Sequence, residues 1–326
     1  MKVKFLIIRF SSIGDIVLTT PVVRCLKEQV EGAEIHYATK KQFVSILEGN
    51  PYIHKIHILD KSLNKLIDDL QAESFDYIID LHHNLRSSII KFRLRRMSFS
   101  FNKLNFEKWL MVKFKKNRLP ANHIVDRYLE TCKFFDVIND NKGLDFYIEP
   151  KNEVDLNLLP PEYNSGYIAF VIGAKHATKQ LPENKIIELC NQINKPLMLL
   201  GGPEDNAKAE RILEKTHKSS IFNACGKFNL QQSASFVKQA QIVISHDTGL
   251  MHIAAAFKHK ILSIWGNTIP EFGMYPYVPN KQYTVFEVKG LKCRPCSKIG
   301  FDKCPKGHFN CMNQQDITGI ANACEF

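Results

Sequence analysis

The sequence has no long apolar run. No stretch of its 326 residues approaches the roughly 18 consecutive apolar residues that a membrane-spanning helix requires. The first 21 residues begin with apolar character, but Arg9 interrupts the run and Asp15 follows it, so a secretory signal peptide does not fit. We therefore expect neither a membrane-spanning bundle nor an exported chain.

The sequence also lacks a disulfide framework, internal repeats and low-complexity tracts. Apolar residues make up 44% and charged residues 24% of the chain, which excludes a disordered or collagen-like protein. The nine cysteines are an odd number, which is typical of a reducing cytoplasm. We expect a cytoplasmic protein whose contact with a membrane, if it makes one, is peripheral. Five of the cysteines are isolated in the sequence: Cys25, Cys132, Cys190, Cys225 and Cys324.

Acidic residues are almost absent from residues 86–118, which we call the basic segment. It holds eleven basic residues and one acid, Glu107, so it carries +10 of the formal net charge of +11. Six aromatic residues are interleaved with these charges. Three interpretations are open: a nucleic-acid patch, a surface for anionic lipid or a membrane, and a solvated helix face.

Short apolar runs alternate with helical patterns through both halves of the chain. Continuous apolar strands in this alternation predict an α/β fold with parallel sheets covered on both faces. A proline-rich polar stretch at 149–165 has the composition of a linker. We therefore expect two doubly wound domains, residues 1–155 and 156–326, with ligands bound in the cleft between them. Strands are expected at 5–8, 34–38, 55–59, 77–81, 167–172, 196–200, 241–245 and 261–265, and helices at 15–30, 62–72, 124–135, 183–193, 204–215 and 249–257.

The first strand-to-helix turn, residues 9–15, lacks the GxGxxG pattern of a dinucleotide site. Asp15 stands where the helix begins. It either caps that helix or serves as a general base, the group an inverting sugar transfer needs to deprotonate an acceptor hydroxyl.

The strongest motif lies in the second half, where a strand, a short turn and a helix span residues 242–256. Thr248 and Gly249 allow close approach to the helix N-terminus, which predicts a pyrophosphate site. Asp247 is an anion, so we expect it to hold the turn or accept a sugar hydroxyl rather than face phosphate. His252 follows one turn later, as a ligand contact or a packed helix histidine.

Two further strand ends carry charged residues. After strand 167–172 come Lys175 and Lys179, either of which can face phosphate or simply be solvated. After strand 196–200 comes Glu204, which can accept both hydroxyls of a ribose or stand as a first-turn helix residue.

A CxxC pair followed by two more cysteines marks the C-terminal region. The pattern fits a structural zinc site, but it also fits reduced thiols or a labile disulfide, because a second CxxC is missing. The four residues are Cys293, Cys296, Cys304 and Cys311.

Several strings in this order and spacing resemble glycosyltransferase family 9, the ADP-heptose:lipopolysaccharide heptosyltransferases. They are RFSSIGDIVLTTP at 9–21, DLHHNLRSS at 80–88, LLGGPED at 199–205, SHDTGLMHIAAAF at 245–257 with IWGNT after it, and CRPC with CPKGHFNCM at 293–312. The resemblance implies a GT-B fold, two Rossmann-like domains with the donor held mainly by the second. It implies inverting, metal-independent transfer of a heptose from an ADP-sugar to an anionic lipopolysaccharide-core or lipid A acceptor, with no cofactor required.

The resemblance also assigns roles. Asp15 matches the family's proposed catalytic base, and Lys179 matches a lysine that contacts the donor phosphates. Glu204 matches the acid that binds the adenosine ribose, and the DTGxxH residues match the donor-binding segment. These last are Asp247, Thr248, Gly249 and His252.

Arg86 falls where basic residues of the family approach the anionic acceptor. The rest of the basic segment has no matching family string, so acceptor contacts by Arg93, Arg95 and Arg96 rest on charge alone. We expect an anionic glycolipid at the inner-membrane surface as the counter-charge, and nucleic acid as the less favoured partner. The alternatives are a related transferase with another nucleotide sugar, and a non-catalytic protein that binds a nucleotide sugar or nucleic acid.

Overall fold

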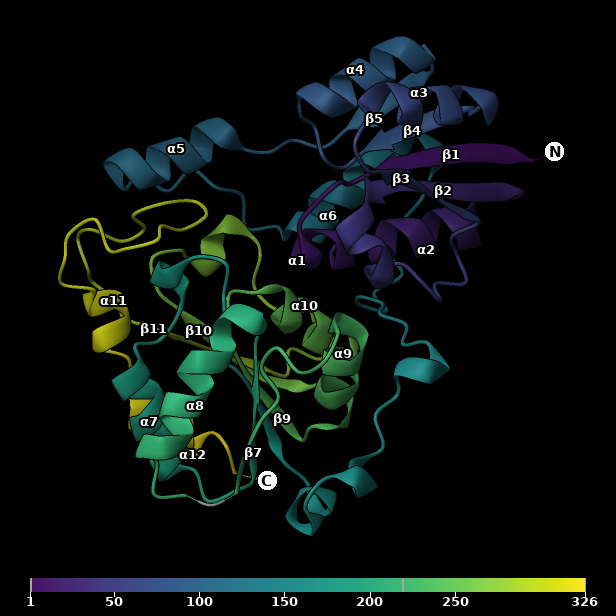
Figure 1. The fold of residues 1–326 in the computed structure, drawn as a ribbon. Helices are drawn as coiled ribbons and strands as arrows, with labels where there is room; N and C mark the ends of the chain where they lie inside the picture. The colour runs from purple at the N-terminus through teal and green to yellow at the C-terminus, as the bar shows by residue number, and fades with distance from the viewer. Residues whose placement is uncertain (1, 219, 326) are drawn as a thin grey trace. The chain divides into compact units, whose positions relative to one another are not determined.

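The computed structural model describes residues 2–218 and 220–325 and divides the chain into two compact units. The first unit comprises Met1–Lys103 and Asn122–Glu149, and the second comprises Leu104–Ala121 and Pro150–Phe326. Figure 1 shows a β-sheet with helices packed against it in each unit. The α/β class predicted from the alternating pattern is confirmed.

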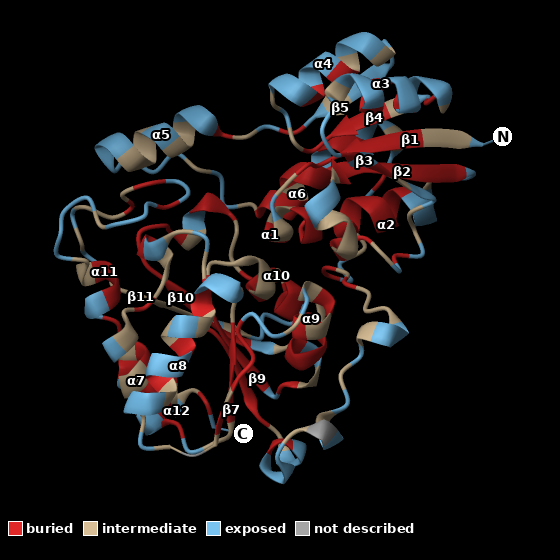
Figure 2. Cartoon of the chain, viewed as in Figure 1, coloured by how far each residue is buried: buried red, intermediate tan, exposed pale blue. Residues whose placement is uncertain are grey.

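The first unit is built on five parallel strands in the order β3-β2-β1-β4-β5. This is a doubly wound order, which reverses direction between β1 and β4. Phe5–Ile8 on β1 are fully buried because helices cover both faces of the sheet (Figure 2). The strands are β1 Val3–Ile8, β2 Ala33–Lys40, β3 Lys55–Leu59, β4 Tyr77–Asp80 and β5 Met97–Ser100, and the helices are α1 Ile13–Val17, α2 Thr20–Gln29, α3 Leu63–Ala72, α4 Leu85–Leu94 and α6 Ile124–Leu129.

The second unit repeats the design with six parallel strands in the order β11-β10-β9-β6-β7-β8. Here the order reverses between β6 and β9. The strands are β6 Ile168–Val171, β7 Leu197–Leu200, β8 Ile221–Asn223, β9 Ile242–His246, β10 Lys260–Trp265 and β11 Tyr283–Glu287. The helices are α5 Asn105–Phe114, α7 Glu183–Gln192, α8 Asn206–Lys215, α9 Leu230–Gln239, α10 Gly249–Ala256, α11 Asn310–Asn313 and α12 Ile317–Asn322.

The predicted elements exist, with two differences in the first half. The single helix expected at 15–30 is two helices, α1 and α2, and Pro21 lies in the first turn of the second. Proline has no N–H to continue an upstream helix but fits a helix start, so the chain restarts there. The helix expected at 124–135 is α-helical only as far as Leu129, and a 3₁₀ helix, Glu130–Phe135, completes it.

Residues 104–121 lie with the second unit, whereas the sequence places them in the first domain. Hydrogen bonds fix this segment to the C-terminal loop: Lys115 Nζ donates to the carbonyl oxygens of Cys293 at 3.3 Å and Pro295 at 2.6 Å. Lys298 Nζ donates to Asn105 Oδ1 at 3.4 Å. The basic segment is therefore shared between the units, and five of its eleven basic residues belong to the second.

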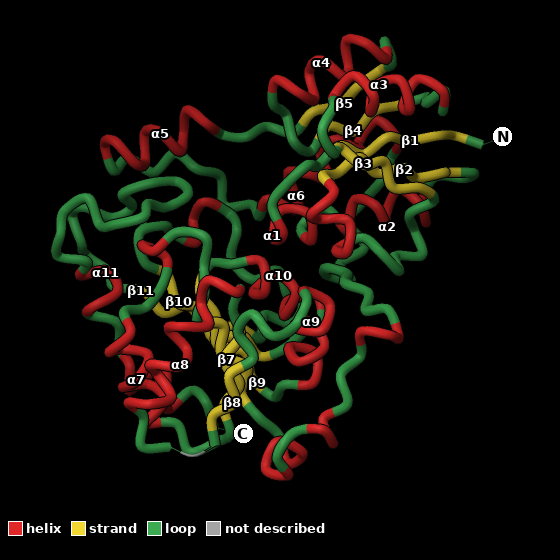
Figure 3. Tube along the Cα trace, in the orientation of Figure 1, coloured by secondary structure: helices red, strands yellow, loops and turns green. Residues whose placement is uncertain are grey.

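Two long connections have little regular structure (Figure 3). The linker after Glu149 contains only short 3₁₀ turns, including Pro150–Asn152 and Pro161–Ser165. Residues 288–309, which carry three of the four clustered cysteines, form neither helix nor strand. In the part of the chain that the structure describes, no helix is both long and apolar enough to cross a bilayer.

Candidate active site

In the first unit, the turn between β1 and α1 holds Asp15 in a fixed orientation. Ser12 stands at the N-cap of α1, and its backbone N–H and Oγ both donate to Asp15 Oδ2, at 3.1 and 2.7 Å. The other oxygen, Oδ1, lies 2.8 Å from Nη2 of Arg9. The carboxylate therefore stabilises the start of α1, as expected of a capping residue, and lies at the carboxyl end of the sheet, where its role as a general base stays a prediction.

Arg9, which the sequence argument treated only as a break in an apolar run, organises this turn. Its buried guanidinium donates to the carbonyl oxygens of Leu81 at 2.5 Å and Ser11 at 2.8 Å, and to Tyr128 Oη at 3.1 Å. Burial lowers the pKa of Arg9, but the Asp15 carboxylate, together with Tyr128 and Tyr37, raises it by more, so the pKa is raised overall. Arg9 therefore stays charged, and it joins the ends of β1 and β4 at the point where the strand order reverses.

His82 lies beside the same turn. Burial, reinforced by the positive charge of Arg9, lowers the pKa of His82 to about 4, so the ring is neutral at neutral pH. Its Nδ1 atom is buried without a hydrogen bond to the described residues. The DLHHN string was noted in the sequence, but the neutral state of His82 depends on its burial, which no local sequence pattern indicates.

In the second unit, three strand ends converge on Asp247. Lys179, in the loop after β6, places Nζ 2.6 Å from Asp247 Oδ2, and Thr268 Oγ1, after β10, donates to the same oxygen at 3.1 Å. Asp247 itself follows β9. The structure thus brings together Lys179 and Asp247, while Lys175, the other candidate lysine, is exposed.

Thr248 and Gly249 form the start of helix α10. Thr248 is the N-cap, but its side chain makes no capping hydrogen bond; its Oγ1 lies 3.1 Å from Ser245 Oγ instead. The first amides of α10 are therefore not capped by a side chain, as a site for an anionic ligand requires. His252 is buried within the helix.

Glu204 is exposed in a 3₁₀ turn, Pro203–Asp205, directly after β7. Its neighbour Asp205 is buried and accepts a hydrogen bond from the Gly202 N–H at 3.0 Å; burial raises the pKa of Asp205. A methyl group on Gly173 would meet Asp205 Oδ2 at 1.9 Å, so this carboxylate requires glycine at the end of β6. The sequence argument named Glu204 and missed Asp205.

Lys208 on α8 is a second residue that the sequence argument missed. Nζ of Lys208 donates to the carbonyl oxygen of Ile172 at 2.9 Å and to Gln180 Oε1 at 2.8 Å. Burial lowers its pKa. The ammonium group thereby braces the loop that carries Lys179.

The arginines predicted to bind the acceptor are exposed on helix α4 or directly after it, and none forms an ion pair with a residue that the structure describes. Lys91 of the same helix differs, because its Nζ lies 2.9 Å from the buried Asp80 Oδ2 and so has a structural role. The exposed arginines are Arg86, Arg93, Arg95 and Arg96.

The clustered cysteines do not form a four-thiolate centre as placed. The Cys293 sulfur lies 3.9 Å from His308 Nε2, and the Cys296 thiol donates to the Cys293 carbonyl oxygen at 3.0 Å. Burial raises the pKa of Cys296 to about 11 and that of Cys311 to about 12. Within residues 2–218 and 220–325, no group of three candidate ligand atoms within 4.8 Å of one another includes a cysteine, so zinc here stays a prediction of the sequence.

Comparison with known proteins gives the class that this fold and these strand-end residues define. The model of glycosyltransferase family 9 (heptosyltransferase) matches residues 63–303. The chain is 25% identical over 296 residues to lipopolysaccharide heptosyltransferase 1 of Campylobacter coli, covering 81% of this chain and 84% of that protein. The chain belongs to glycosyltransferase family 9 and is a glycosyltransferase.

Solved structures agree on the fold. The family 9 glycosyl transferase of Veillonella parvula superposes with a TM-score of 0.80 at 21% identity, covering 99% of this chain and 96% of that one. Escherichia coli heptosyltransferase WaaC, solved with ADP, superposes with a TM-score of 0.67 at 21% identity, covering 86% and 92%. The two doubly wound units are those of a GT-B fold.

Proposed function

We propose that this protein transfers a heptose from ADP-heptose to an anionic lipopolysaccharide-core acceptor, with inversion at the anomeric carbon. The observation that carries the proposal is Asp15, held by Arg9 and Ser12 at the carboxyl end of the first sheet. Relatives named as lipopolysaccharide or lipooligosaccharide heptosyltransferases support the acceptor class. WaaC structures with ADP and with ADP-2-deoxy-2-fluoro heptose support the donor.

The second unit offers three features that suit an ADP-sugar. The uncapped amides of α10 at Thr248–Gly249 suit the pyrophosphate, and Lys179 supplies a cation beside them. Before the donor binds, the Asp247 carboxylate pairs with the Lys179 ammonium group, so neither charge is left without a partner. An arriving pyrophosphate then competes with Asp247 for Lys179. The exposed Glu204 carboxylate suits the two ribose hydroxyls.

In this mechanism the acceptor hydroxyl attacks the anomeric carbon while the bond from that carbon to the ADP oxygen breaks. The proton of the hydroxyl passes to Asp15. A carboxylate is a far weaker base than an alkoxide, so we expect proton transfer to occur together with carbon–oxygen bond formation, when the hydroxyl is most acidic. Lys179 and the α10 amides stabilise the charge that develops on ADP, without a requirement for metal.

The test is turnover by an Asp15→Asn variant with ADP-heptose and a deacylated lipopolysaccharide core. Removal of a general base should lower kcat by about 10²–10⁴-fold, while calorimetry shows ADP binding unchanged. The matched control is Asp68→Asn, which changes an exposed carboxylate on α3. Turnover of D15N at the rate of D68N would contradict the role of Asp15. ADP-glucose and UDP- or GDP-sugars, assayed with the unaltered protein, test the donor.

We further propose that helix α5 docks on an anionic bilayer surface, where the acceptor lipid resides. The helix has no buried residue and exposes Phe106, Trp109 and Phe114. Lys113, in the helix, and Lys116, just after it, are exposed as well. Aromatic rings combined with basic residues suit the interface of an anionic membrane, and a lipid-linked acceptor favours a bilayer over nucleic acid as the counter-charge.

A further inference from the structure

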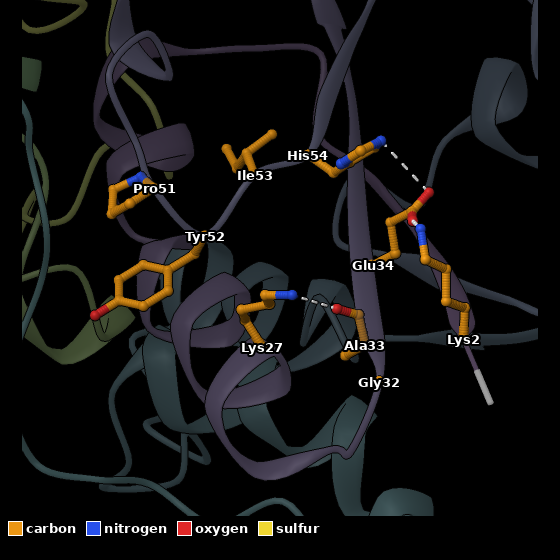
Figure 4. A pocket seen from close by; sticks show the side chains of 9 residues that line it. All are labelled: Lys2, Lys27, Gly32, Ala33, Glu34, Pro51, Tyr52, Ile53 and His54. Carbon is orange, nitrogen blue, oxygen red and sulfur yellow. Dashed lines mark hydrogen bonds and ion pairs between the residues drawn. The ribbon is translucent and has the colours of Figure 1, made fainter.

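Three side chains in the first unit, away from the residues assigned to transfer, direct candidate metal-ligand atoms at one point. Glu34 and His36 are two residues apart on β2, so their side chains lie on the same face of the sheet. His54 directly precedes β3. The backbone N–H of His54 donates to the Ile35 carbonyl oxygen at 2.8 Å, which fixes its position against β2. Figure 4 shows the His54 ring directed at the Glu34 carboxylate in the wall of a pocket of about 450 Å³.

The distances between these atoms fit a tetrahedral ion. Glu34 Oε1 lies 3.1 Å from His36 Nε2 and 3.5 Å from His54 Nε2, and all three atoms lie within 4.8 Å of one another. A zinc ion with ligand bonds of about 2.0–2.1 Å holds its ligand atoms roughly 3.3 Å apart. Two imidazoles and one carboxylate, with water in the fourth position, are a common zinc donor set.

A further histidine, His57, contacts the ring nitrogen of His36 that does not face Glu34. His36 Nδ1 lies 2.9 Å from His57 Nε2, and the two rings are stacked at 5.2 Å. A His36 that binds metal through Nε2 carries its proton on Nδ1, and His57 Nε2 is placed to accept it.

Two lysines lie beside the same carboxylate, and the site must accommodate them. Lys2 Nζ lies 3.0 Å from Glu34 Oε2, the oxygen that faces away from the histidines, and Lys4 Nζ lies 3.6 Å from Oε1. The Lys2 side chain is 78% exposed, so it can turn into solvent without loss of packing. A second group, His36, His57 and Glu73, is less suitable because its carboxylate oxygen lies 4.0 Å from His36, against 3.1 Å for Glu34.

We propose that Glu34, His36 and His54 bind one divalent transition-metal ion of the zinc class, with His57 as the hydrogen-bond partner of His36. The ion joins β2 to the start of β3 at one edge of the first sheet. The site is independent of the transfer reaction, because none of its residues has a place in the donor, acceptor or catalytic assignments.

The experiment is a Zn²⁺ titration of the tag-free full chain against a chromophoric chelator, with fold checked by circular dichroism. We expect Glu34→Gln and His54→Gln to bind one equivalent less than the unaltered protein. His217→Gln, which changes an exposed histidine on another surface, should bind as the unaltered protein does. His57→Phe keeps a ring in place and removes the acceptor, so its affinity should fall about 10–100-fold.

Co²⁺ binding separates this site from the cysteines, because thiolate ligands give an intense near-ultraviolet charge-transfer band that imidazole and carboxylate ligands do not. Loss of one equivalent in H54Q without loss of a thiolate band supports the proposal. Equal stoichiometry and affinity in H54Q and the unaltered protein, or binding through thiolates only, would overturn it.

Discussion

Asp205 illustrates how a single buried carboxylate constrains the residues around it. A Cβ on Gly173 would lie 1.9 Å from Asp205 Oδ2, and one on Gly201 would lie 2.7 Å from the same atom. A Cβ at either position would therefore force the buried Asp205 side chain to shift. Asp205 in turn accepts the Gly202 N–H, so the loop that carries Glu204 depends on this packing.

We predict that Gly173→Ala lowers the free energy of unfolding by about 1–3 kcal/mol, the usual cost of overpacking. Urea denaturation followed by tryptophan fluorescence measures this directly, because Trp109 and Trp265 both belong to the second unit. Asp205→Ala removes the atoms that the new methyl group meets, so the loss from G173A should be smaller in that background. Equal losses in both backgrounds would contradict the clash.

Several of the catalytic and donor-binding residues predicted from the sequence share one property: they lie in the loops that follow apolar strands. Asp15, Lys179 and Asp247 were found in this way, because parallel strands gather their carboxyl ends at one edge of the sheet. Arg9 and Lys208 were missed because their roles arise from burial and from partners distant in the chain, such as Leu81 for Arg9. No local pattern reports such partners.

At the scale of the element, helix α5 differs from every other helix of eight or more residues in the described chain, since it alone has no buried residue. The side chains of Phe106 and Trp109 stack at 6.0 Å, and Trp109 meets Phe114 edge-on at 5.3 Å. The exposed rings thus contact one another along the helix, which also carries Lys108 and Lys113.

We predict that Trp109→Ala weakens co-sedimentation with anionic vesicles by roughly 10-fold, since partial burial of a large apolar side chain contributes about 1–2 kcal/mol. Ile138→Ala changes an exposed apolar residue outside α5 and should have no effect. Binding should weaken as salt rises and be much poorer on zwitterionic vesicles. Equal binding of W109A and I138A, or tighter binding to duplex nucleic acid than to vesicles, would contradict the docking surface.

Most elements could be predicted because their apolar residues recur with the period of a buried strand or a helix. The strands β5, β8 and β11 were not predicted: each lies at the edge of its sheet and includes partly exposed residues, which interrupts the apolar run. The assignment of α5 to the second unit was also missed, because it depends on contacts such as Lys115 with Pro295, far away in sequence.

At the scale of the whole molecule, buried neutral histidines make stability depend on pH. His246, on β9, accepts the Leu181 N–H at 2.9 Å, and burial, together with the charge of Lys208, lowers its pKa to about 3. An unfolded histidine titrates near 6.5. Between these values the unfolded state binds a proton that the native state does not, so stability is lost as pH falls from 6.5 toward 3.

We predict that His246→Gln flattens this dependence, because glutamine can accept the same N–H and does not titrate. The free energy of unfolding of the second unit, measured by tryptophan fluorescence at pH 7 and pH 4.5, should fall less in H246Q than in the unaltered protein. The difference should approach about 1.4 kcal/mol per pH unit. His217→Gln, at an exposed position, should follow the unaltered protein, and parallel behaviour of H246Q would show that His246 is not the group responsible.

Residues 104–121 leave the first unit, pack with the second and return, so the chain passes between the units three times. One cut in the gene therefore cannot isolate either half. A fragment that stops at Glu149 retains α5 without the loop that anchors it, so the helix is left without the hydrogen bonds that fix its position. A fragment that starts at Pro150 loses that helix altogether. To study each unit separately, the gene must be rejoined at two places. In the first unit a short linker connects Lys103 to Asn122, and in the second unit residues 104–121 are fused ahead of Pro150.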